Sequence, residues 1–254
     1  MKNTRLTILS GVLLSTLVVG CMLASAQSKW EIIIPQSNFG AKLRATAFHN
    51  ESFGVTGGMG DAGKASATKD GGKTWIPTKE SAGSSGCIVA FADTKTGWIG
   101  TGNKFKKTAD GGTIWEELTL PKGVTGVAAT ALRTPKDGYL VDINGNLHIT
   151  KDGGETWSSQ SLGLDNPKIL DYSSGFFVNA TPQAAVRFFD ANNGLIVLGL
   201  AGETNMVALR TADGGKTWKR ESLTGGLGKP YLSRDGKFLT LNLMDKGVTV
   251  LKYK

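Results

Sequence analysis

Thr211-Ala-Asp213-Gly-Gly215-Lys-Thr217-Trp218 is the clearest copy of an eight-residue pattern that occurs four times in this chain. Two further copies begin at Thr68 and Thr150, and the fourth, which begins at Thr108, carries Ile114 where the others carry a second Thr. Asp accepts hydrogen bonds from backbone N–H groups a few residues ahead of it, and Gly tolerates positive φ angles. Because apolar or β-branched residues flank the copies, the pattern predicts a tight turn that joins two strands.

We expect the repeated aspartates to have a structural role. A carboxylate that is satisfied inside its own turn explains every position of the pattern, so these side chains are not expected to be catalytic acids or metal ligands. The Trp opens the outgoing strand and covers the turn with its ring. The predicted structural residues are Asp70, Gly72, Trp75, Asp110, Gly112, Trp115, Asp152, Gly154, Trp157, Asp213, Gly215 and Trp218.

The pattern resembles the Asp-box, also called the bacterial neuraminidase repeat, which is a hairpin on the outer rim of many β-propellers. In that family the box is structural and lies away from the active face. The resemblance therefore implies a β-propeller whose functional site lies elsewhere than at these turns.

The spacing of the copies predicts the same architecture. Asp110 follows Asp70 by 40 residues, and Asp152 follows Asp110 by 42. Before each copy, an apolar residue is followed six places later by Gly, as in Phe91 and Gly97. A period of about 40 residues with four strands per repeat is typical of propeller blades. The chain is thus predicted to be all-β and built of four-stranded antiparallel blades.

The two ends of the chain complete this prediction. Residues 30–35 read as the outermost strand of a blade, yet no turn precedes them. Residues 238–243 and 248–253 read as the second and third strands of a blade that has no outermost strand after them. The first strand can complete the last blade, which closes the ring and removes two exposed sheet edges. This gives five blades, with six as the alternative.

One interval between the copies is longer than the others. Asp213 follows Asp152 by 61 residues, which places about 14 extra residues between Trp157 and Ala184. An additional blade would need about 40 residues. Residues 162–183 are therefore predicted to form a long loop or an added hairpin that packs against the propeller, with a partner-binding element as the alternative.

Residues 1–26 have the features of a secretory signal peptide. Lys2 and Arg5 give a basic start, and a long apolar run follows them. Residues 24–26 read Ala-Ser-Ala and fit cleavage by a general signal peptidase, whereas residues 17–21 resemble a bacterial lipobox in which Cys21 would be lipidated. A retained transmembrane anchor is a third option. We predict an exported protein, periplasmic or extracellular, with one domain over residues 27–254, and lipid anchoring through Cys21 as the alternative.

Composition and motifs argue against several functions. The formal charge is +8, and because Lys2 and Arg5 carry two of these charges, about +6 remains after the leader. Basic residues are spread along the chain without a recognisable nucleic-acid-binding module, so no nucleic acid is expected as a partner. His49 and His148 fall in different blades, and no zinc motif, phosphate loop or Gly-x-Ser-x-Gly elbow occurs. We expect no catalytic residue, no metal and no cofactor.

The expected ligand face is the one that carries the loops between blades and the loops between second and third strands. Arg44, Arg133 and Arg187 are predicted to lie at neighbouring levels of three innermost strands, where they would line the channel. A cluster of arginines with converging carboxylates would favour a glycan ligand, as in sialidases. The chain has no Arg-Ile-Pro signature of that class.

Two further segments carry a second resemblance. Phe91-Ala-Asp93-Thr-Lys-Thr-Gly97-Trp98 and Phe188-Phe-Asp190-Ala-Asn-Asn-Gly194-Leu195, combined with the repeated turns, resemble the photosystem II assembly and stability factor family of propellers. Its members in phototrophs are non-enzymatic helpers of membrane-complex assembly, usually with seven blades, so five blades are a departure. The resemblance implies a non-enzymatic scaffold that binds another protein or a membrane complex of the envelope. A glycan-binding or glycan-cleaving, sialidase-like protein is the alternative, and we expect a monomer.

Overall fold

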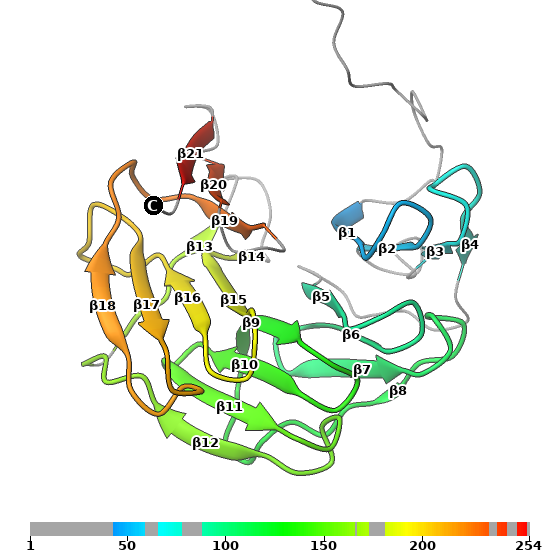
Figure 1. The fold of residues 1–254 in the computed structure, drawn as a ribbon, viewed down its shortest axis with the longest axis horizontal. Coiled ribbons are helices and arrows are strands. Elements are labelled where there is room, and N and C mark those ends of the chain that lie inside the picture. Colours follow the sequence, from blue (N-terminus) through cyan, green and yellow to red (C-terminus); the bar gives the residue numbers. More distant parts are fainter. Residues whose placement is uncertain are drawn as a thin grey trace, which may run out of the picture. The chain divides into compact units, whose positions relative to one another are not determined.

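The computed structural model describes residues 43–58, 66–77, 88–165, 167–172, 181–233, 238–242 and 248–252 (Figure 1). Every regular element in these ranges is a β-strand. None of the ranges contains a helix that could cross a membrane. The fold is therefore all-β, as the sequence predicts.

The strands form a five-bladed β-propeller, which confirms the number of blades expected from the repeats. Within each blade, consecutive strands pair antiparallel in chain order. Four blades have four described strands and the fifth has three. Residues 30–35, expected to add the outermost strand of the fifth blade, lie outside the described residues.

Each blade is formed by strands that follow one another in the chain. Blade one comprises β1 (Leu43–Phe48), β2 (Gly54–Gly58), β3 (Ser66–Thr68) and β4 (Ile76–Pro77). Blade two comprises β5 (Ile88–Phe91), β6 (Gly97–Thr101), β7 (Lys104–Thr108) and β8 (Glu116–Glu117). Blade three comprises β9 (Val127–Leu132), β10 (Gly138–Asp142), β11 (Asn146–Thr150) and β12 (Ser158–Ser161). Blade four comprises β15 (Ala184–Phe188), β16 (Gly194–Leu198), β17 (Val207–Thr211) and β18 (Lys219–Ser222). Blade five comprises β19 (Lys229–Leu232), β20 (Phe238–Asn242) and β21 (Val248–Lys252).

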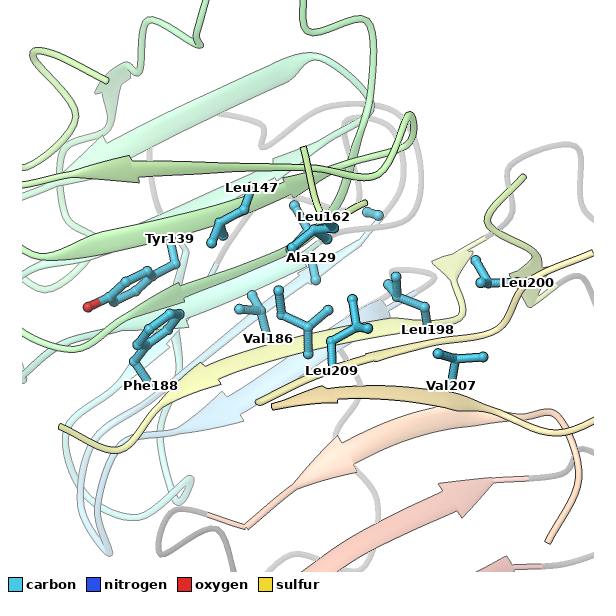
Figure 2. Packing of buried hydrophobic residues seen from close by; sticks show 13 residues of the cluster. Ala129, Tyr139, Leu147, Leu162, Val186, Phe188, Leu198, Leu200, Val207 and Leu209 are labelled. Carbon is cyan, nitrogen blue, oxygen red and sulfur yellow. The ribbon is translucent and has the colours of Figure 1, made fainter. Parts of the chain in front are cut away.

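The first strands of successive blades lie next to one another, and the core lies between the blades. β1 contacts β5, β5 contacts β9, β9 contacts β15 and β15 contacts β19. The largest apolar cluster joins blades three and four: Figure 2 shows Tyr139 and Leu147 of blade three facing Val186, Phe188 and Leu209 of blade four. Burial of these sheet faces stabilises the fold by about 25 cal/mol for each Å² of apolar surface removed from water.

The apolar-to-Gly pattern of the sequence has a packing explanation. In blades one, two and four, the aromatic residue at the end of the first strand packs against the Gly that opens the second, as Phe188 does against Gly194. In blade three Leu132 replaces the aromatic residue, and the Trp98 indole of blade two fills the space at Gly138 instead. A side chain at these glycines would occupy the volume of the ring.

The described residues of the long interval add no sixth blade. They form a two-stranded ladder of β13 (Asp171–Tyr172) and β14 (Thr181–Pro182). Ile169 forms an isolated bridge with Leu200 of blade four's loop, and Leu162 belongs to the core between blades three and four. This part of residues 162–183 thus packs against the propeller.

Candidate functional site

The repeated turns are closed by hydrogen bonds among their own residues. In the last copy, the Thr211 hydroxyl donates to Asp213 Oδ1 (2.7 Å) and accepts from the Gly215 N–H (2.9 Å). Thr217 donates its N–H to Asp213 Oδ1 (3.0 Å) and its hydroxyl to Oδ2 (2.5 Å). Gly215 has a φ of 93°, a conformation that favours Gly.

These hydrogen bonds keep the turn carboxylates ionised. The Thr217 hydroxyl and N–H hold the pKa of Asp213 well below its usual range, and the equivalent bonds from Thr74 lower the pKa of Asp70 to about 2. Asp152 has the same set of partners and a lowered pKa. A carboxylate that is ionised and occupied by its own turn is poorly suited to donate a proton, so the geometry supports a structural role.

Two of the tryptophans that follow the turns have a hydrogen-bonded indole N–H. Trp157 Nε1 donates to the Thr119 carbonyl oxygen (3.0 Å), and Trp218 Nε1 donates to the Gly215 carbonyl oxygen (3.0 Å). Trp115 is buried in the cluster between blades one and two. Trp157 thus ties its turn to the segment after β8, Trp218 closes its own turn, and Trp115 packs against blade one.

The second copy of the turn differs from the other three. Asp110 Oδ1 accepts hydrogen bonds from the Thr108 hydroxyl and from the N–H groups of Thr113 and Ile114. Because Ile114 has no hydroxyl, Asp110 Oδ2 receives no hydrogen bond from the described residues. The Ile114 side chain is 59% exposed. This turn therefore presents an apolar side chain beside an open acceptor.

Two grooves border the second turn, and Asp110 lines both of them. The groove between blades one and two has a volume of about 560 Å³ and includes the buried ring of Phe53. The groove between blades two and three has a volume of about 380 Å³ and includes Ile114. Lysines lie in both. We use the name second-turn surface for Phe53, Lys69, Lys95, Lys107, Asp110 and Ile114.

The three arginines predicted to line the channel have different surroundings. Arg187 lies within β15 and is half-buried. Arg133 follows β9, in the turn that leads to β10, and its guanidinium pairs with Asp137. Arg44 lies in β1 with its side chain outside the described residues, and Cys21 lies outside them altogether. The described part of the chain thus places Arg44 and Arg187 in innermost strands, whereas Arg133 lies just after β9 and is bound to a turn carboxylate.

A third cavity lies at the opposite end of blade three from its repeated turn. It has a volume of about 290 Å³ and is bordered by Lys122, which lies between blades two and three, and by the β10–β11 turn. Asp142, His148 and Ser159, from three successive strands, meet here. His148 Nε2 lies 3.1 Å from Asp142 Oδ2, and His148 Nδ1 lies 2.7 Å from Ser159 Oγ. Asp142 and His148 are buried, whereas Ser159 is exposed.

Asp142 determines where the imidazole proton lies. Its Oδ1 accepts the N–H groups of Asn144 (2.9 Å) and Asn146 (2.8 Å). Burial acts to raise the pKa of Asp142, but hydrogen bonds from His148 and Asn146 outweigh this effect and lower it. An ionised carboxylate only accepts hydrogen bonds. In the neutral imidazole, His148 therefore carries its proton on Nε2, and Nδ1 accepts the Ser159 hydroxyl proton.

The sequence does not reveal this group of residues. It predicts only a strand or surface position for His148, and neither Asp142 nor Ser159 belongs to a motif. Only the register of the three strands, which pairs Leu140 with His148 and His148 with Ser159, brings them together. The sequence signal that could have revealed this group is His148 itself, because the equivalent strand position in blade four is occupied by Leu209.

No family model matches the sequence, and neither does any curated protein. Solved structures share its fold. The Niastella koreensis GH74 enzyme matches with a TM-score of 0.54 and 16% identity over 84% of this chain, which spans 36% of that enzyme. YCF48 bound to a D1 peptide has a TM-score of 0.42 and 16% identity, over 79% of this chain and 88% of that one. YCF48 from Cyanidioschyzon merolae has a TM-score of 0.44 and 16% identity, over 86% of this chain and 97% of that one. At these identities the likeness concerns the fold alone.

Proposed function

We propose that this protein is an exported propeller that binds an acidic, partly apolar segment of a partner protein at the cell envelope. The observation that carries the proposal is the second turn, where Ile114 replaces the Thr of the other copies and is 59% exposed. The proposed binding surface therefore lies at a repeated turn and not on the loop face expected from the sequence. A Thr at position 114 would donate a hydrogen bond to Asp110. The exposed Ile side chain gives the turn no such bond. A binding role accounts for it.

The surroundings of Ile114 suit an extended peptide. Ile114 borders the groove of about 380 Å³, and Asp110 connects this groove to the one of about 560 Å³, which includes the apolar ring of Phe53. Asp110 Oδ2 is placed to accept a backbone N–H of the peptide. Lys69 and Lys95 border the larger groove, so acidic side chains would be favoured there.

Export is proposed from the N-terminal sequence, in which Lys2 and Arg5 precede an apolar run and Ala24-Ser25-Ala26. The mature N-terminus, measured by mass spectrometry of the protein from its native host, distinguishes the forms. A chain that begins at Gln27 indicates a free exported protein, and a lipidated Cys21 indicates an anchored one. An intact Met1 would contradict cleavage.

The binding proposal is tested with two fluorescent peptides, one alternating Leu and Glu and the other alternating Leu and Lys, by anisotropy at low and high salt. We expect the acidic peptide alone to bind and salt to weaken it. Ile114→Thr should lower affinity about tenfold, since it removes one apolar side chain from the interface. Ile143→Thr, at another exposed Ile in the β10–β11 turn, is the matched control and should leave affinity unchanged.

Charge reversal gives the sharper readout. Lys69→Glu with Lys95→Glu should abolish binding of the acidic peptide and allow the lysine peptide to bind. Equal affinity of the wild type and this double variant for the acidic peptide would overturn the proposed surface. Failure of both peptides together with binding to sialylated glycans would favour the glycan-binding alternative.

A further inference from the structure

The contacts among Asp142, His148 and Ser159 are not a requirement of the propeller repeat. In blade two the residues at the His148 and Ser159 positions are Lys106 and Glu117, which form a surface ion pair at 3.7 Å. In blade four they are Leu209 and Arg220. The same strand pairing is thus built with three unrelated side-chain pairs. The hydrogen-bonded group of Asp142, His148 and Ser159 in blade three has no counterpart in the other described blades.

The hydrogen bonds that link Asp142, His148 and Ser159 have the direction that activates a hydroxyl. Asp142 holds the proton of His148 on Nε2, so Nδ1 faces the Ser159 hydroxyl as an acceptor at 2.7 Å. Proton transfer to Nδ1 would leave the developing imidazolium charge next to the Asp142 carboxylate, which stabilises it. Ser159 itself is exposed and borders the cavity of about 290 Å³.

Donors for a developing negative charge are also near Ser159. The Leu162 N–H donates to the Gly145 carbonyl oxygen (3.1 Å), so these two residues form a hydrogen-bonded pair of the β11–β12 ladder. Hydrogen-bonded and non-hydrogen-bonded pairs alternate along an antiparallel ladder, which makes the pair of His148 and Ser159 a non-hydrogen-bonded one. The Ser159 amide N–H therefore points to the open edge of β12, the last strand of its sheet. Lys122 borders the same cavity and adds a positive charge.

We infer that Ser159 is an activated nucleophile and that this cavity accepts a small polar carboxylic ester. The Ser159 Oγ–carbonyl carbon bond forms as the hydroxyl proton moves to His148 Nδ1. The bond from that carbon to the leaving oxygen then breaks, and the leaving oxygen takes the proton from Nδ1. Water attacks the acyl-serine, gives its proton to Nδ1, and releases the carboxylic acid as Ser159 regains its proton. This activity is independent of the second-turn surface.

The experiment uses the full mature chain with a fluorophosphonate probe and with p-nitrophenyl acetate. We expect labelling of the wild type with the mass shift on the peptide that contains Ser159, and ester hydrolysis that Ser159→Ala abolishes. His148→Leu, which copies the blade-four residue and should fold, is expected to slow labelling by about 100-fold because it removes the base. Ser158→Ala, one residue away on the opposite face of β12, should label as the wild type does.

Asp142 acts as a positioning residue in this scheme. Asp142→Asn can still accept the Asn144 and Asn146 N–H groups but no longer fixes the His148 tautomer, so kcat for the ester should fall while KM stays the same. Labelling that persists in Ser159→Ala, or a wild type that is not labelled at all, would overturn the inference. Equal labelling rates in His148→Leu and the wild type would do so as well.

Discussion

The ring of Tyr139 in β10 stacks on the ring of Phe188 in β15, with centroids 3.8 Å apart and planes inclined by 7°. Trp218 meets Phe188 edge-on, with its centroid 6.0 Å from that of Phe188. Both members of the stack are buried. The stack therefore joins blades three and four through two side chains whose proximity no sequence pattern indicates.

Phe188→Ala should lower the free energy of unfolding by about 3–5 kcal/mol, because it leaves a cavity between two blades. Phe48 holds the equivalent position in blade one but is 51% exposed, so Phe48→Ala should cost about 1 kcal/mol or less. Urea unfolding followed by Trp fluorescence measures both. Equal losses would contradict a core centred between blades three and four.

Gly194→Ala should be destabilising by about 1–3 kcal/mol through overpacking. An added Cβ would lie 2.8 Å from Phe188 Cε1, and Phe188 is enclosed by its neighbours. Gly54→Ala places a Cβ 2.9 Å from Phe48 Cδ1, but that exposed ring can move away. The matched pair of variants should thus differ in urea midpoint, with Gly54→Ala near the wild type.

Tyr139→Phe should leave stability unchanged or raise it by up to about 1 kcal/mol. The Tyr139 hydroxyl is buried and has no hydrogen-bond partner among the described residues, so the protein loses nothing when it is removed. Differential scanning calorimetry is the appropriate measurement. A fall in the melting temperature would indicate that the hydroxyl has a partner.

Acid should destabilise the repeated turns between about pH 4 and pH 2. The pKa of Asp70 is about 2 in the folded chain and about 3.9 when unfolded. Because the unfolded state then binds the proton more tightly, stability is full above this range and is lost as the pH falls through it. Thr74→Val removes the largest cause of the lowered pKa of Asp70. The part of the folding stability that depends on ionised Asp70 should therefore become smaller.

The urea midpoint of Thr74→Val should accordingly vary less with pH over this range than that of the wild type. Thr113→Val is the control, since the Thr113 hydroxyl donates to the main-chain oxygen of Asp110 rather than to a carboxylate. The control should follow the wild-type pH profile. Identical profiles for Thr74→Val and Thr113→Val would count against the role of the hydroxyl.

Ile114→Thr should stabilise the second turn by about 0.5 kcal/mol, at the low end for a hydrogen bond because the site is exposed. The new hydroxyl can donate to Asp110 Oδ2, as Thr217 does to Asp213. Ile76→Thr, at an equally exposed Ile just after the first turn, where Thr74 already donates to both carboxylate oxygens of Asp70, should give no such gain. A gain in stability with a loss of peptide binding would show that the natural residue serves binding.

The sequence by itself determined the architecture, because the responsible interactions are local and repeated. Each turn closes within eight residues, as at Asp213. The Gly that accommodates an aromatic ring lies six residues after that aromatic residue, as Gly194 does after Phe188. The period of these signals predicted five blades, and the structure confirms them. No long-range contact had to be known.

Only the tertiary structure decided what the surfaces offer. Asp142, His148 and Ser159 meet because three strands pair in one register, and a shift of one residue would turn Ser159 to the other face of the sheet. Likewise, the two grooves that Asp110 lines exist only where neighbouring blades pack, and the pairing of Arg133 with Asp137 depends on the geometry of one turn. Local chemistry repeats along the chain, whereas a site depends on where strands distant in sequence come to lie.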